Sequence, residues 1–343
     1  MLFLCALAIS VKAQSPTQNY VLSKDVLDVD GTHAITTVTY YDGLGYPVET
    51  ATNSLGGMGK NNGTFGLIDD LTYSYNGNQI KAISDKAGSL LYNGSFDFKD
   101  GANADVEYFY DANGALVKDL NKGISNIEYD ILGNLKCITF SNGFKTKYIY
   151  DAAGNKLRTT HESVVANTTD YIGNFVLEDG KLSKYLFDGG YCSFDNNQNP
   201  SFHYYEKDHL GSVRMVVNEN GTIEQVNHYY PFGGVYGDLS YKGELQRNKY
   251  IGKEFDHMYG LDWYDHGARM YDAARLAWDR MEPLYDKYYP LNTYLYSGNN
   301  PINSIDDDGN RIIVWYKDKI GNDQSFVFTG QETKELPQNQ FVR

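Results

Sequence analysis

Residues 129–154 read YDILGNLKCITFSNGFKTKYIYDAAG, and this stretch decides the fold. Residues 135–140 (LKCITF) carry apolar side chains at both sets of alternating positions, as a strand packed on two sides does. Asn142-Gly143 is the turn signal typical of a tight β-hairpin. The returning strand places four residues on one face: Phe144, Thr146, Tyr148 and Tyr150. The stretch therefore predicts a hairpin with both faces partly apolar.

A repeated corner, Tyr-Asp-x-x-Gly, bounds this hairpin. Copies begin at Tyr41, Tyr110, Tyr129 and Tyr150, and a weaker copy begins at Tyr75. The last three full copies start 19 and 21 residues apart, a period that suits two strands with two turns. We expect each aspartate carboxylate to accept backbone N–H groups two or three residues on, and each glycine to take a positive φ. The repeated aspartates are thus interpreted as turn residues, not as catalytic residues.

The composition extends this interpretation to the whole chain. Among 343 residues are 31 tyrosines, 34 glycines and only 8 prolines. Tyrosine favours half-buried strands and glycine favours tight turns, so we predict an all-β protein of many short strands. The net charge of -14, with 44 acidic and 30 basic residues, repels a phosphate backbone, and no nucleic acid partner is predicted.

The first residues predict export. Met1–Ala13 is an apolar run that ends in Val11-Lys12-Ala13, close to the small-residue rule for signal cleavage, with Gln14 as the mature start. The run lacks a charged start, so the signal is either incomplete or a weak match, and a buried strand is the alternative. It is too short to span a bilayer, and no transmembrane segment is predicted. The expected location is secreted or in the cell envelope.

Five motifs follow one another in the second half of the chain. They are Asp208–Arg214 (DHLGSVR), Tyr229–Gly233 (YYPFG), Gly252–Asp256 (GKEFD), Tyr264–Asp272 (YDHGARMYD) and Tyr294–Asp306 (YLYSGNNPINSID). Together with the Tyr-Asp corners they resemble the Rhs/YD-repeat family, from roughly Val38 to Gly309. Ile35–Glu49 is also similar to the opening region of many such proteins from Bacteroidetes. The resemblance implies a spiral or open antiparallel sheet of repeat hairpins that ends in an Rhs core plug.

We divide the chain accordingly. The predicted parts are a signal peptide at 1–13, N-terminal strands and a loop at 14–65, a repeat region at 66–200, the Rhs core at 201–309 and a variable tail at 310–343. The core is expected to form an aromatic plug of nine residues: Trp263, Tyr264, Tyr271, Trp278, Tyr285, Tyr288, Tyr289, Tyr294 and Tyr296. The tail predicts a hairpin that cannot bury a core alone, so no complete toxin is expected. About five turn units favour an open sheet over a closed container.

In toxin-bearing members the Rhs core is an aspartyl-type autoprotease, and the resemblance implies where such a site lies here. The arginine of the Gly-Ala-Arg motif is Arg269, the acid is Glu282, and cleavage is expected between Gly309 and Asn310. A carboxylic acid can activate water, and an arginine can bind the developing oxyanion. Glu282 replaces an aspartate and Asp307 replaces a proline of the family pattern. The alternatives are a structural ion pair or two unrelated polar residues.

Metal and cofactor signals are weak. The seven histidines lack paired zinc spacing, and the acidic run 306–308 lacks the later glutamate of a calcium loop, so no metal or cofactor is predicted. Cys137 and Cys192 are interpreted as small buried apolar residues without a disulfide.

The predicted function follows from these parts. We expect an exported scaffold, more than an enzyme, that presents or carries a C-terminal segment, as in polymorphic toxin or cell-surface systems. Autoproteolysis near Asn310 is the first alternative, and binding of a surface carbohydrate or receptor is the second. The expected partner is an immunity protein or a cell-surface target.

Overall fold

The computed structural model describes residues 19–26, 34–41, 47–53, 67–87, 98–236, 246–288, 291–317 and 323–328. Three predicted features lie outside these ranges: the signal run 1–13, the first Tyr-Asp corner after Tyr41 and residues 54–65 of the predicted loop. The described residues form strands and turns, with three short 3-10 segments. None of these helical segments has the length and apolar character needed to cross a membrane.

The first sheet holds five antiparallel strands in chain order. They are β1 (Asn19–Val26), β2 (Ala34–Tyr41), β3 (Pro47–Asn53), β4 (Leu67–Asn76) and β5 (Gln79–Asp85). The weak Tyr75 copy of the repeat forms the turn from β4 to β5, where Gly77 has a φ of 59°.

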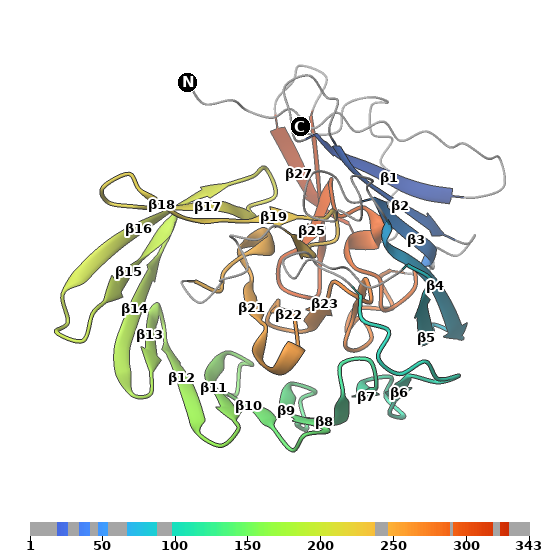
Figure 1. The fold of residues 1–343 in the computed structure, drawn as a ribbon, viewed down its shortest axis with the longest axis horizontal. Coiled ribbons are helices and arrows are strands. Elements are labelled where there is room, and N and C mark those ends of the chain that lie inside the picture. The colour runs from blue at the N-terminus through green and yellow to red at the C-terminus, as the bar shows by residue number, and fades with distance from the viewer. Residues whose placement is uncertain are drawn as a thin grey trace, which may run out of the picture.

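The second sheet holds thirteen antiparallel strands, again in chain order. The first seven are β6 (Tyr108–Tyr110), β7 (Leu116–Asp119), β8 (Ile124–Tyr129), β9 (Leu135–Phe140), β10 (Lys145–Tyr150), β11 (Lys156–Glu162) and β12 (Ala166–Ile172). The last six are β13 (Phe175–Glu178), β14 (Lys181–Phe187), β15 (Gly190–Phe194), β16 (Pro200–Lys207), β17 (Val213–Asn218) and β18 (Ile223–Val226). The predicted hairpin is confirmed as β9 and β10, with Thr146 paired to Ile138. Figure 1 shows this sheet curving around the C-terminal part of the chain.

The C-terminal part forms small sheets inside that curve. It contains β19 (His228–Tyr229), β20 (Val235–Tyr236), β21 (Glu254–Asp256), β22 (Trp263–Asp265), β23 (Met270–Asp272) and β24 (Ala277–Trp278). A last sheet joins β25 (Ser304–Asp306), β26 (Ile312–Lys317) and β27 (Asp323–Val327). The 3-10 segments are η1 (Tyr250–Gly252), η2 (Met258–Gly260) and η3 (Ser297–Asn299).

The Tyr-Asp corners work as turn chemistry. Asp151 Oδ1 accepts the backbone N–H of Ala153 at 2.8 Å and that of Asn155 at 2.9 Å. These acceptor bonds reach two and four residues on, and the Gly154 N–H, three residues on, lies at the same corner and donates to the Asp151 carbonyl at 3.1 Å. Gly154 has a φ of 83°. It directly precedes Asn155, and its positive φ turns the chain back so that the Asn155 N–H reaches the Asp151 carboxylate. Asp111 and Asp130 repeat the same pattern.

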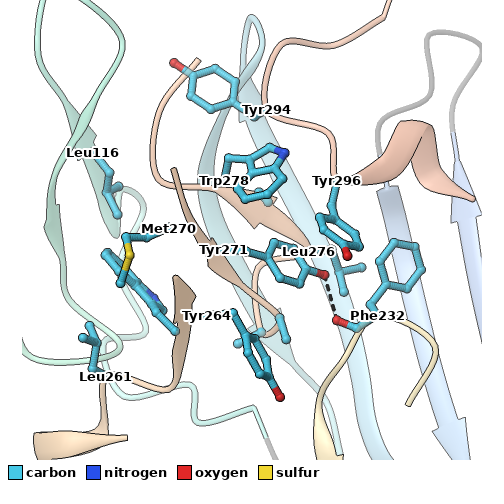
Figure 2. Packing of buried hydrophobic residues seen from close by; sticks show 14 of the residues in the cluster. Leu116, Phe232, Leu261, Tyr264, Met270, Tyr271, Leu276, Trp278, Tyr294 and Tyr296 are labelled. Carbon is cyan, nitrogen blue, oxygen red and sulfur yellow. Dashed lines mark hydrogen bonds between the residues drawn. The ribbon is translucent and has the colours of Figure 1, made fainter. Parts of the chain in front are cut away.

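The main core joins the sheets to the C-terminal part, as Figure 2 shows. Tyr271 and Tyr296 stack with ring centroids 4.0 Å apart, and both are fully buried. The phenol of Tyr271 donates to the Phe232 carbonyl at 2.8 Å, and that of Tyr264 donates to the Gly233 carbonyl at 2.8 Å. Backbone carbonyls of the segment before β20 thus satisfy these two buried phenols.

The predicted burial was wrong for one residue of the aromatic plug. Tyr285 is 58% exposed, whereas Trp263 and Trp278 are completely buried. Tyr285 lies in the turn after Glu282, where its backbone N–H bonds the Glu282 carbonyl, and this turn faces outward. Tyr289 lies outside the described residues. The predicted all-β, open antiparallel fold is confirmed, and Cys137 and Cys192 are buried and free, as expected.

Candidate functional site

Arg269 is the centre of the candidate site. It stands directly before β23, after a turn in which the Gly267 N–H bonds the Asp265 carboxylate at 2.8 Å. Only 1% of Arg269 is exposed, and its guanidinium carbon lies 4.2 Å from the ring centroid of Trp278. The ring face attracts the cation and shields it from water.

Two carboxylates meet this guanidinium. Arg269 Nη2 donates to Glu282 Oε2 and, at 3.1 Å, to Asp306 Oδ2. The two acids come from the loop after β24 and from the end of β25, and both are buried. The structure therefore joins the two predicted residues in an ion pair, and their interpretation as unrelated polar residues was wrong. It also adds Asp306 as a third member.

The predicted cleavage segment lies against the same arginine. Arg269 Nε donates to the carbonyl oxygen of Gly309 at 2.5 Å. Gly309 has a φ of 73°, and a Cβ at this position would stand 2.8 Å from the backbone nitrogen of Arg269. Only glycine fits both the conformation and the space. The carbonyl of the bond between Gly309 and Asn310 is thus held on a buried cation.

Neighbouring groups fix the chain on both sides of Gly309. His266 Nδ1 lies 2.6 Å from the backbone carbonyl of Asp306, to which it donates. The Tyr288 phenol donates to the Asn310 carbonyl at 3.3 Å and accepts the Ile312 N–H at 3.2 Å. The segment is therefore anchored before and after the predicted scission point.

Burial governs the protonation of the site. Burial raises the pKa of Glu282, Arg269 opposes this, and the charge of Asp306 adds to it. Burial likewise raises the pKa of Asp306 against the effect of Arg269. The pKa of His266 is lowered to about 3, chiefly by burial, so this imidazole is neutral at physiological pH. Two acids with raised pKa values beside one cation are a chemically unusual arrangement, of the kind found at reactive sites.

A small pocket adjoins Glu282. It is lined by Glu282, Tyr285, Tyr288, Leu291, Asn292, Thr293, Leu295 and Ile312, and it has room for about one water molecule. A hydrolytic reaction needs such a water near a carboxylate.

The acidic run after β25 acts as a polar turn. Asp308 Oδ1 accepts the backbone N–H groups of Asn310 and Arg311, each at 3.0 Å, and its other oxygen pairs with the Arg311 side chain. No cluster of three metal-ligating side chains occurs among the described residues.

Sequence reasoning found Arg269, Glu282, Gly309 and Asn310 but missed the roles of three neighbours. Asp306 was considered as the end of the last motif and as part of the acidic run 306–308, but not as a partner of Arg269. His266 and Tyr288 gave no local signal, because their partners lie 40 and 22 residues away.

Comparisons with known proteins agree with the fold. The Teneurin YD-shell family model matches residues 59–302. Salivary gland surface protein 1 of Aedes aegypti is 29% identical over 231 residues, which are 58% of this chain and 6% of that protein. The tRNA3(Ser)-specific nuclease WapA of Bacillus spizizenii is 26% identical over 264 residues, 71% of this chain and 11% of the nuclease. The chain thus spans about a tenth or less of the length of these curated relatives.

A solved structure shares the same fold. The Photorhabdus luminescens Tc holotoxin pore, with a TccC3 variant, aligns with a TM-score of 0.56 at 18% identity. The alignment covers 80% of this chain and 15% of that chain. Because the family model matches more than half of the 343 residues, the chain belongs to the Teneurin YD-shell family and is an Rhs/YD-repeat protein.

Proposed function

We propose that this protein is an exported YD-shell scaffold that holds a C-terminal segment on its core plug. The main support for this proposal is the hydrogen bond that buried Arg269 donates to the Gly309 carbonyl. Directly after it, β26 pairs with β25 from Asp306↔Ile312 to Ser304↔Val314. The segment that follows Gly309 is therefore fastened by both a side-chain clamp and a strand ladder.

The relatives support a carrier role. One matched protein is a tRNA nuclease and a structural neighbour is part of a Tc holotoxin pore, so related shells occur in toxins. A secreted or cell-envelope location, with an immunity protein or a cell-surface target as partner, completes this proposal.

Hydrogen exchange of the full chain tests the holding role. We expect slow exchange of the backbone amides of residues 312–314, and at least about tenfold faster exchange in Arg269→Met if the clamp fastens the segment. Ser325→Ala, at an exposed position of the neighbouring strand β27, is the control and leaves those amides protected. Fast exchange at 312–314 in the wild-type chain is incompatible with the proposal.

A second candidate, autoproteolysis after Gly309, is favoured by a specific observation. The carbonyl that Arg269 binds belongs to the bond expected to be cut, and two buried acids share the same guanidinium. In this reaction an ionised carboxylate takes a proton from water, and the oxygen attacks the Gly309 carbonyl carbon. Arg269 stabilises the oxyanion. The second, protonated carboxyl group donates its proton to the Asn310 nitrogen as the C–N bond breaks, giving a new carboxylate and a new amino terminus.

Intact mass spectrometry of the purified full chain over days tests this candidate. We expect a fragment that begins at Asn310, with its formation abolished in Glu282→Gln and in Asp306→Asn. Asp307→Asn is the matched control, because Asp307 lies in the same turn but its side chain is 61% exposed and pairs with Lys253. A single full-length species under all conditions would exclude autoproteolysis and leave the holding role intact.

A further inference from the structure

A second set of reactive groups lies on the thirteen-stranded second sheet, away from Arg269. Ser193 Oγ is 2.9 Å from His203 Nε2, and His203 Nδ1 is 2.5 Å from Glu224 Oε2. The three residues belong to β15, β16 and β18. A hydroxyl, an imidazole and a carboxylate in series are the parts of an activated nucleophile: the base contacts the nucleophile, and a third group orients the base.

The carboxylate partner determines which nitrogen of the neutral His203 ring carries the proton. A carboxylate only accepts, so the contact with Glu224 assigns a proton to His203 Nδ1. In the neutral imidazole His203 Nε2 is then the acceptor and the Ser193 hydroxyl the donor, which is the state that a general base needs before reaction.

Local structure holds this series in place. The ring of Tyr191 stacks on His203 with centroids 4.3 Å apart and an interplanar angle of 9°. A register shift between β17 and β18 leaves Glu224 as the extra residue between the partners of Val216 and Val217. Asn218 Nδ2 donates to the other Glu224 oxygen at 3.3 Å. Imidazole and carboxylate are thus each held by a neighbour.

Strand register places these groups on the face of the sheet that turns toward the core. Tyr171, whose hydroxyl donates to Glu254 of β21, pairs with Val176, which pairs with Lys184, which pairs with Ser193. Residues directly opposite one another share a face. The region has its own small core of Tyr191, Val213 and Val216.

The groups are partly open to solvent. The His203 side chain is 10% exposed and the Glu224 side chain 24%, and Ser193 is partly buried. Lys184 is paired with Ser193 across β14 and β15 on the same face. Its ammonium lies 5.8 Å from the ring centroid of Tyr191, which stacks on His203, and 3.9 Å from Glu178 Oε1.

We propose that Ser193, His203 and Glu224 form a serine nucleophile centre that takes small carboxylic esters. Ser193 Oγ bonds to the acyl carbon as its proton moves to His203 Nε2, and the imidazolium returns that proton to the departing alcohol. Water then attacks the acyl-serine by the same route, releasing a carboxylic acid and restoring the hydroxyl. Lys184 stabilises the oxyanion in each step, and Glu224 is a positioning residue.

An alkyl fluorophosphonate ester is the probe for this centre. With the full chain we expect one adduct by intact mass, mapped to Ser193 by peptide sequencing, as fluoride leaves and an oxygen–phosphorus bond forms. Ser193→Ala abolishes the adduct, and His203→Gln slows its formation by at least about 100-fold. Lys184→Met slows it with the adduct site unchanged.

Matched controls separate reactivity from folding. Ser201 pairs with Ser193 across β15 and β16, and no histidine contact is found for it among the described residues, so Ser201→Ala labels at the wild-type rate. Unchanged fluorescence of Trp263 and Trp278 in the distant core checks that each variant folds. In Glu224→Gln the low-field proton resonance of His203 Nδ1–H is lost and labelling slows.

Absence of any adduct, or an adduct that persists in Ser193→Ala, shows that the three residues are a hydrogen-bonded strut between strands. Cleavage after Gly309 involves none of these residues, so its presence or absence leaves this result unaffected.

Discussion

Arg269 Nε donates to the Gly309 carbonyl at 2.5 Å, across forty residues of chain. This bond joins the turn before β23 to the turn after β25, and the same guanidinium also pairs with Glu282 and Asp306. Opposite charges and a backbone acceptor thus converge on one buried cation, and they define the geometry of the plug.

Gly309→Ala tests the fit at the acceptor side. The added Cβ meets the Arg269 backbone nitrogen at 2.8 Å, and the φ of 73° is unfavourable for alanine. We expect a loss of about 1–3 kcal/mol in the free energy of unfolding, measured by urea titration. Gly143→Ala is the control, because Gly143 has a φ of 86° with no atom within 4 Å of the added Cβ. Equal losses in both variants would show that the contact with Arg269 adds nothing.

Arg269→Met removes the cation and leaves two buried carboxyl groups without it. We expect a loss of about 3–5 kcal/mol at neutral pH. Glu282 and Asp306 already have raised pKa values in the folded chain, so they bind protons more tightly there than when unfolded. Their favourable contribution is present at acid pH and is lost as pH rises through their folded pKa values. Without the cation this loss is larger, so the variant should recover part of its stability at pH 4.

Urea titrations at pH 4 and pH 7 measure this recovery. Arg311→Met is the control, because Arg311 pairs with Asp308 on an exposed turn and its loss should change stability little at either pH. A penalty for Arg269→Met that does not depend on pH would contradict the role given to the two acids.

Local rules predicted the corners of the shell. Asp130 and Gly133 act within five residues of chain, so the sequence contains all of their turn chemistry. The alternation in 135–140 likewise predicted β9, because strand periodicity is local.

The candidate site was predictable only in part. Motif positions identified Arg269 and Glu282. The contact between Asp306 and Arg269 joins residues 37 positions apart in the sequence, and no local pattern specifies it. Burial within the plug was equally hidden: Tyr285 is 58% exposed and Tyr296 is fully buried, although both are tyrosines in an aromatic-rich stretch. Such differences arise from packing between distant segments, and local propensity does not contain them.

His266 should resist protonation. Its pKa is lowered from 6.5 to about 3, chiefly by burial, so the folded chain binds this proton less well than the unfolded chain. Its contribution to stability is present above about pH 6.5 and is lost as pH falls toward 3. His266→Gln keeps a donor for the Asp306 carbonyl and removes this titration.

Paired urea titrations of the wild type and His266→Gln at pH 7 and pH 4 isolate the effect of His266. The variant should be less stable at pH 7, where it loses ring packing against Trp278, and the difference should shrink at pH 4. A constant difference between pH 7 and pH 4 would refute the buried neutral state of His266.

Lys156 connects the thirteen-stranded sheet, which forms the shell, to the C-terminal core plug. Its ammonium lies 2.7 Å from Glu254 and 2.6 Å from Asp265, which belong to β21 and β22, while Lys156 itself begins β11. Lys156→Met leaves two carboxylates without this cation, and we expect a loss of about 3 kcal/mol or more at pH 7. Lys147→Met is the matched control, because Lys147 pairs with Glu162 within the sheet at an exposed position and should matter little.

The difference in stability between the wild type and Lys156→Met should become smaller at acid pH. In the folded chain Lys156 and Arg247 overcome the effect of burial and lower the pKa of Glu254 from 4.5 to about 2. The resulting stability is present above about pH 4.5 and is lost as pH falls toward 2. Without Lys156 the pKa of Glu254 rises, so Lys156→Met loses less stability on acidification than the wild type does. The urea midpoints of the two proteins should therefore lie closer together at pH 3 than at pH 7. If the midpoints stay equally far apart, the attraction between Lys156 and the core carboxylates does not hold the plug in the shell.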